Sequence, residues 1–140
     1  MEHSHVVPAM IRKMHEAKIN GLDYITLWGD GSPLREFTYS HDIADGLMLL
    51  LRDYNSQEPI NIGNSNELSI QYLAQKIKEK IGFSGDIVWD TSMPSGQMRK
   101  PSSSDNFREM YPDFKFTSLD DGIESVCNWF QNAYPNVRGV

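Results

Sequence analysis

The chain of 140 residues has a net charge of −6, with 39% hydrophobic and 23% charged residues, which excludes a disordered or collagen-like protein. The acidic balance gives no broad positive field for nucleic acid or an anionic membrane, so neither is expected as a partner. No apolar run approaches the roughly 18 residues of a membrane span, and the N-terminus lacks the pattern of a secretory signal. The single cysteine, Cys127, cannot form an internal disulfide. We therefore expect one soluble, cytoplasmic domain over residues 1–140.

Helices and short extended segments are predicted to alternate in the first half of the chain. Apolar residues at three- and four-residue spacing predict a helix from about Val7 to Ala17, with Ser4 as its N-cap. Extended segments at 25–28 and 34–37 then flank a Gly-Asp-Gly-Ser-Pro turn. The next helix begins near Ser40, and its apolar set is wide enough to predict burial in the core. That set comprises Ile43, Ala44, Leu47, Met48, Leu50 and Leu51.

The second half of the chain continues the mixed pattern. Residues 59–63 and 87–89 are predicted to form short strands, and between them Ser69 is expected to cap a helix that stops at Gly82. Residues 91–104 form a long polar segment without apolar periodicity, which favours a lid or a binding loop. A short helix at 105–110 and a final amphipathic helix complete the chain. The apolar face of that final helix comprises Leu119, Ile123, Val126, Cys127 and Phe130.

Two common kinds of site are not expected. The segment Gly29-Asp30-Gly31 lies in a short turn with no helix after it, so it is not a dinucleotide-binding fingerprint. The four histidines and one cysteine show neither zinc-finger nor metalloprotease spacing. The sequence therefore predicts no metal site.

Four stretches in a fixed order carry a resemblance to a known family. They are 4–13 (SHVVPAMIRK), 27–37 (LWGDGSPLREF), 60–63 (INIG) and 90–100 (DTSMPSGQMRK). The sequence resembles the GDP-L-fucose synthases, extended short-chain dehydrogenases that epimerise GDP-4-keto-6-deoxy-D-mannose and reduce it with NADPH. The resemblance implies a small mixed α/β substrate-binding domain that corresponds to the C-terminal half of these enzymes and lacks their N-terminal Rossmann half.

The family's Gly-rich loop and catalytic Tyr-x-x-x-Lys pair are not in these residues. Tyr72 and Lys76 have that spacing, but they lie within an amphipathic helix, and we interpret the spacing as coincidence. Without these groups the hydride step has neither its NADP cofactor nor its acid, so the chain alone is predicted to be inactive and not to bind NADP. The expected partners are a GDP-sugar and the N-terminal Rossmann half or a full-length synthase, and self-association into a homo-oligomer would also cover exposed surface.

The resemblance assigns roles to two residues near the reacting sugar. His5 matches the family's catalytic histidine, a general acid in epimerisation that also lies at the cofactor, and the alternative is an exposed histidine near a terminus. Arg35 matches a substrate arginine, whose guanidinium can grip a diphosphate, and the alternative is a surface ion pair with Glu36 or an aspartate. Cys127 is interpreted as a core residue and not as the family's second catalytic group.

Three further residues match substrate-contacting positions of the family. Lys13 occupies the place of a basic substrate residue, although an isolated lysine on a polar helix face is usually only solvated. Trp28 matches a tryptophan that contacts the nucleotide, and its alternative is core packing at a strand end. Lys100 resembles a diphosphate-contacting lysine. Lys13, Arg35 and Lys100 would together form a basic cluster that favours an anionic ligand.

Two other functions fit the same residues. One is a non-catalytic nucleotide-sugar-binding or regulatory module. The other is a related epimerase or reductase for a different nucleotide sugar, which base preference for guanine over uracil or thymine would distinguish.

Overall fold

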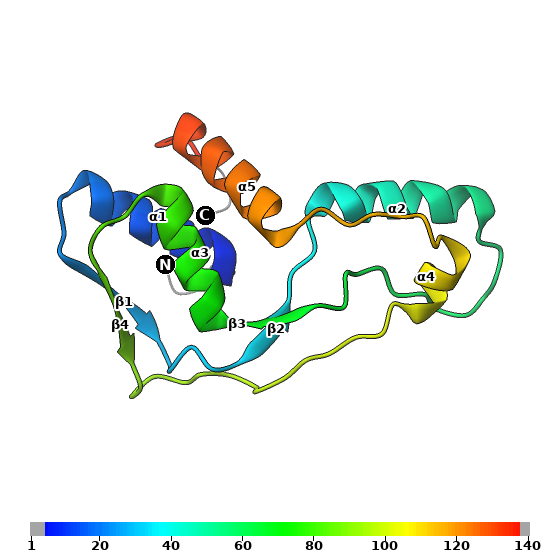
Figure 1. The fold of residues 1–140 in the computed structure, drawn as a ribbon, viewed down its shortest axis with the longest axis horizontal. Coiled ribbons are helices and arrows are strands. Elements are labelled where there is room, and N and C mark those ends of the chain that lie inside the picture. The colour runs from blue at the N-terminus through cyan, green and yellow to red at the C-terminus, as the bar shows by residue number, and fades with distance from the viewer. Residues whose placement is uncertain (1–4, 138–140) are drawn as a thin grey trace.

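The computed structural model describes residues 5–137, and Figure 1 shows its helices and strands. In chain order they are α1 (Val6–Ile19), β1 (Tyr24–Trp28), β2 (Leu34–Glu36), α2 (Ser40–Asp53), β3 (Glu67–Ser69), α3 (Ile70–Ile81), β4 (Asp86–Asp90), α4 (Asp105–Met110) and α5 (Leu119–Ala133). None of these helices is long and apolar enough to cross a membrane.

The strands form two small sheets. In the first, β1 pairs in parallel with β4, so that Ile25 lies opposite Ile87 and Trp28 lies opposite Asp90. In the second, β2 pairs antiparallel with β3, and Glu36 lies directly opposite Glu67. The two strands that flank the Gly-Asp-Gly-Ser-Pro turn therefore belong to different sheets. The turn carries the chain from one sheet to the other.

The core lies among α1, α3, α5 and the β1–β4 sheet. Met14 of α1, Leu73 and Ile77 of α3, and Cys127 of α5 are all fully buried. Burial raises the pKa of the Cys127 thiol to about 11, so the reactive thiolate is scarce at neutral pH. The prediction that Cys127 is a structural core residue is confirmed.

Several helix boundaries agree with the sequence. The Ser69 hydroxyl accepts a hydrogen bond from the Tyr72 N–H at 3.1 Å at the start of α3, and Gly82 ends that helix with φ of 69°, a conformation that glycine adopts at little cost. The short helix α4 has the predicted bounds, and residues 91–104 contain no helix or strand. The N-cap of α1 is His5, and the predicted cap, Ser4, lies outside the described residues.

The prediction that the helix after Ser40 is buried in the core is wrong. Of its predicted apolar set only Leu50 is buried, and Leu51 is 80% exposed, with Leu47 and Met48 also exposed. Figure 1 shows that most of α2 lies apart from the packed helices α1, α3 and α5, with α4 beside it. Apolar spacing identifies a face that requires a partner, but it does not show whether that partner lies within the same residues.

The face of α2 that is covered packs on the segment before β3 and on α4. A Cβ atom at Gly46 would lie 3.1 Å from Ile62 and 3.2 Å from Phe107, so glycine permits this close approach. At the start of α2 the buried Asp42 carboxylate accepts hydrogen bonds from the Thr117 N–H at 2.8 Å and hydroxyl at 2.7 Å.

The predicted strand at 59–63 is also absent from the structure. A strand exists only when a neighbour satisfies its backbone hydrogen bonds, and no strand among residues 5–137 pairs with this segment. The structure instead forms β3 at Glu67–Ser69, which sequence reasoning missed. Three residues are too few to show the alternation by which strands are recognised.

The buried His15 gives a testable pH dependence. Its ring lies 4.7 Å from that of Tyr134 and 5.3 Å from that of Phe130, and burial, with Lys18 nearby, lowers the pKa of His15 against the smaller opposing effect of Glu16. A folded-state pKa below the unfolded value means that protonation favours unfolding. Stability is therefore expected to be full above about pH 6.5 and to fall as the pH drops through the folded-state pKa.

Urea denaturation between pH 7.5 and pH 5 measures this effect. His15→Phe is expected to weaken the pH dependence, whereas His41→Gln, which changes an exposed histidine of α2, is expected to leave it unchanged. An identical pH profile for His15→Phe and the wild-type chain would contradict the assignment.

Candidate functional site

A cavity of about 620 Å³ lies between α1, the end of β1, β2 and the long segment 91–104. We call it the candidate cavity. Its wall is apolar along the first turns of α1 and carries charged and polar groups where β2 and the long segment meet it. The lining residues are Val6, Ala9, Met10, Lys13, Leu27, Trp28, Arg35, Glu36, Phe37, Ile70 and Ser95. The structure thus brings together three residues that the sequence singled out: Lys13, Trp28 and Arg35.

Lys13 is fixed on the cavity wall. It lies one turn before the end of the buried face of α1, and its Nζ donates a hydrogen bond to the Thr26 carbonyl of β1 at 2.7 Å. The side chain is half-buried, so the alternative of a merely solvated lysine is wrong. An ammonium group has three N–H donors, and the bond to Thr26 leaves donors for an anion.

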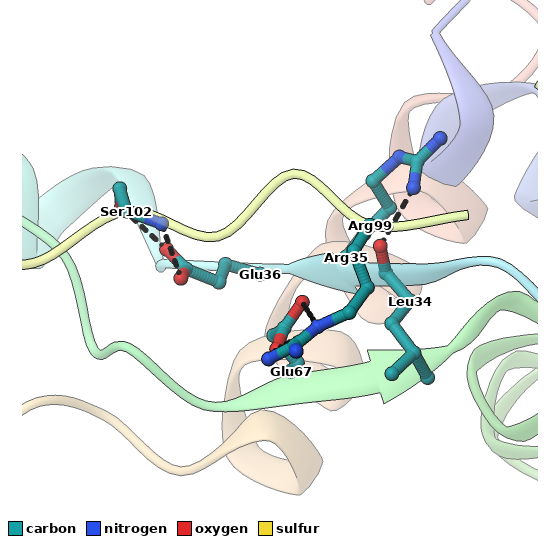
Figure 2. Close-up of polar contacts among 6 residues, drawn as sticks. All are labelled: Leu34, Arg35, Glu36, Glu67, Arg99 and Ser102. Carbon is teal, nitrogen blue, oxygen red and sulfur yellow. Dashed lines mark hydrogen bonds and ion pairs between the residues drawn. The ribbon is translucent and has the colours of Figure 1, made fainter. Parts of the chain in front are cut away.

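Arg35 projects from the middle of β2. Its Nη1 donates to the Leu34 carbonyl at 2.6 Å, as Figure 2 shows. Arg35 forms no ion pair within the part of the chain that the structure describes, and the neighbouring Glu36 carboxylate is engaged by Ser102 instead. The alternative of an Arg35 surface ion pair is therefore wrong. A half-buried guanidinium without a carboxylate is suited to bind an external anion.

Trp28 ends β1 and is 58% exposed. The alternative of core packing is therefore wrong, because more than half of the surface of Trp28 is accessible to solvent. An exposed flat ring beside two cations suits a ligand that has both an aromatic base and a phosphate group.

His5 and Lys100 are not among the residues that line the candidate cavity. His5 is exposed at the N-cap of α1, where its carbonyl accepts from the Ala9 N–H at 3.0 Å, and the next residue, Val6, lines the cavity. Lys100 is exposed near the end of the long segment. Of the three residues of the predicted basic cluster, Lys13 and Arg35 line the candidate cavity.

Sequence reasoning missed Ser95 as a lining residue. Its hydroxyl donates to the Asp30 carboxylate at 3.3 Å, and a Cβ atom at Gly29 would lie 2.6 Å from its Oγ. The long segment therefore presses against the turn after β1, and the positive φ of 77° at Gly29 makes that contact possible. Hydrogen bonds from Ser32, with a smaller contribution from Ser95, hold the pKa of Asp30 below its usual range. In the sequence, the glycine that follows Ser95, Gly96, was the available signal that the backbone of the long segment approaches another part of the chain closely.

Within residues 5–137 there is no group of three or more histidine, cysteine, aspartate or glutamate side chains that could hold a metal ion. The polar side chains that line the candidate cavity are instead two cations, one hydroxyl, one indole and one carboxylate. This set is suited to an organic anion.

The first part of the sequence matches a known family model. Residues 1–63 match the NAD dependent epimerase/dehydratase family. Over 134 residues the chain is 50% identical to a GDP-L-fucose synthase from Sinorhizobium fredii, a match that covers 95% of this chain and 42% of the relative. It is 42% identical over 129 residues to GDP-L-fucose synthase 1 from Arabidopsis thaliana, covering 92% of this chain and 40% of that protein.

The fold gives the same result. A crystal structure of a GDP-L-fucose synthetase from Naegleria fowleri bound to NADP matches with a TM-score of 0.91 at 38% identity, covering 96% of this chain and 42% of that one. The chain thus spans about two fifths of the length of the relatives that it matches, and the match lies in their C-terminal part. By sequence and by fold, this chain is therefore related to the GDP-L-fucose synthases and corresponds to their C-terminal part.

Proposed function

We propose that this chain is the GDP-sugar-binding part of a GDP-L-fucose synthase, which epimerises GDP-4-keto-6-deoxy-D-mannose and reduces it with NADPH to GDP-L-fucose. The observation that carries the proposal is the candidate cavity, where Lys13, Trp28 and Arg35 line one wall. These residues come from α1, β1 and β2, and each one matches a substrate-contacting position of the family. The proposal therefore rests on one cavity built from three separate elements.

The chemistry of each side chain fits one part of a nucleotide sugar. Arg35 can donate two parallel N–H bonds to the diphosphate, and Lys13 adds a second positive charge held in place by the Thr26 carbonyl. The exposed ring of Trp28 offers a stacking surface for guanine. The apolar residues of α1 lower the local polarity beside these groups, which would strengthen ionic contacts to a bound diphosphate.

His5 is proposed as the general acid of the epimerisation and as a residue beside the cofactor. An imidazole can donate and recover a proton at a carbon next to a ketone. Lys100 is proposed to reach the diphosphate from the long segment. Both residues are exposed to solvent.

NADP is the expected cofactor of the complete enzyme, as in the Naegleria relative. The described residues do not fit it as a binding site of their own, because the turn at Gly29 to Gly31 leads from β1 to β2 and not into a helix N-terminus. Alone, the chain is expected to be inactive.

The Rossmann part of a synthase, on the same or on a separate polypeptide, is the proposed partner of α2. The relatives are more than twice the length of the matched region, and α2 exposes Leu47, Met48 and Leu51 along one face. The segment 59–63, which lacks a strand neighbour here, lies in the same part of the chain. A sheet in the partner would bury the exposed face of α2 and pair with the segment 59–63.

Replacing Leu51 with aspartate tests this docking surface. Co-expression with the Rossmann part of the Sinorhizobium fredii relative is expected to give a complex that Leu51→Asp weakens at least about tenfold, because a buried leucine contributes about 1.5–3 kcal/mol. The control is Leu22→Asp, which places the same charge at an exposed leucine outside α2. Equal effects of the two variants on complex yield and affinity would refute the assignment to α2.

Isothermal titration tests the binding function itself. GDP-mannose is expected to bind saturably and more tightly than UDP-glucose. Equal affinity for the two nucleotides, or no binding at millimolar GDP-mannose, would contradict a preformed GDP-sugar site in this chain. Preference for a uracil or thymine nucleotide would favour a related epimerase or reductase.

A further inference from the structure

Two glutamates lie directly opposite each other in the β2–β3 sheet. The register places Glu36 directly opposite Glu67, where side chains in an antiparallel pair approach to about 5 Å. Like charges in this position destabilise a strand pair. The sheet therefore requires donors from elsewhere to compensate both carboxylates.

The long segment supplies those donors. The backbone N–H and hydroxyl of Ser102 donate to Glu36 at 2.9 Å and 2.7 Å. The Arg99 guanidinium donates from Nε to both oxygens of Glu67, at 3.1 Å and 2.9 Å, and also from Nη2 to one of them. Figure 2 shows Arg99 directed toward Glu67 and Arg35 directed away from it.

Glu67 is largely buried, so its carboxylate depends on the hydrogen bonds from Arg99. The Glu67 side chain is 13% exposed, whereas that of Arg99 is 62% exposed. Hydrogen bonds from Arg99 hold the pKa of Glu67 below its usual range. A largely buried carboxylate without a hydrogen-bonding partner would be disfavoured.

The same segment forms part of the candidate cavity. The segment also contacts β2 between Ser95 and the Arg99 and Ser102 contacts, where the Leu34 N–H donates to the Met98 carbonyl at 2.8 Å. The segment therefore runs along β2. Ser95 lines the cavity, and a Cβ atom at Gly96 would lie 3.5 Å from Nη2 of Arg35. The segment therefore lies beside the guanidinium that is proposed to bind the diphosphate.

We propose that Arg99 and Glu67 are positioning residues: their ion pair fixes residues 95–102 along β2 and holds the cavity wall beside Arg35. The inference rests on the proposed function in that its consequence for binding concerns the GDP-sugar cavity. The segment is a fixed wall in this proposal and not a mobile lid. Arg99 acts through Glu67, because its guanidinium is directed to β3 and away from Arg35.

Hydrogen exchange followed by NMR and titration with GDP-mannose test the proposal together. In Arg99→Gln the N–H groups of Leu34 and Ser102 are expected to exchange at least about tenfold faster, because opening of the anchored segment exposes them. The affinity for GDP-mannose is expected to fall about tenfold, because the ligand must then order the wall. The double variant Glu67→Arg/Arg99→Glu is expected to restore both properties, since it keeps the pair and removes the like charges opposite each other.

The matched control is Arg52→Gln, which breaks an exposed ion pair with Asp53 on α2 and makes the same change in charge. It is expected to change neither exchange at Leu34 and Ser102 nor the affinity. Unchanged exchange in Arg99→Gln would overturn the inference, whatever the affinity. A charge-swapped variant that regains slow exchange but not affinity would also overturn it, because Arg99 would then contact the ligand itself. A wild-type chain that binds no GDP-mannose, with fast exchange in Arg99→Gln, would refute the proposed function and leave the anchoring supported.

Discussion

Replacing Arg35 with alanine is expected to weaken GDP-mannose binding by about 10- to 100-fold, the loss that follows from removing a charge-assisted hydrogen-bonding partner of a phosphate. Arg35 lines the candidate cavity and has no carboxylate partner among residues 5–137. The substitution therefore leaves no buried carboxylate unpaired, and stability should change little. Isothermal titration measures the affinity, and urea denaturation checks the stability.

The control for Arg35 is Arg52→Ala, which removes a guanidinium from α2, outside the candidate cavity. It is expected to leave the affinity unchanged. If both variants bind GDP-mannose equally well, the diphosphate is not held by Arg35. Arg35→Lys is expected to bind with intermediate affinity, because lysine retains the charge and loses the paired donors.

Replacing Phe130 with alanine is expected to lower the free energy of unfolding by about 3–5 kcal/mol, the usual cost of truncating a buried phenylalanine. Phe130 of α5 is 1% exposed and contacts the rings of His15 and Tyr134. Its removal would leave a cavity between α1 and α5. Chemical denaturation followed by circular dichroism measures the change.

Trp129 provides the matched comparison, because it is the preceding residue of α5 and is 54% exposed. Trp129→Ala is expected to cost less than about 1 kcal/mol, as is usual for exposed positions. Similar losses for both variants would contradict the orientation of α5 in the core.

The periodic helices show how much of the fold local pattern determines. The apolar face of α3, its Ser69 cap and its Gly82 stop all follow from residues within the helix or next to it, so spacing and capping chemistry are sufficient. The same holds for α5 and for Cys127 on its buried face. For the site, the resemblance singled out Lys13, Trp28 and Arg35, but their convergence required α1, β1 and β2 to pack together.

The sequence by itself determined the mixed α/β character and the amphipathic helices, and it singled out the residues that we propose to bind a GDP-sugar. Only the tertiary structure decided that α2 exposes most of its apolar set, that 59–63 lacks a strand neighbour and that Arg99 pairs with Glu67. The physical reason is the range of the interactions. Helix periodicity and capping act over a few neighbouring residues, whereas burial of a face, pairing of a strand and compensation of a charge depend on groups distant in the chain.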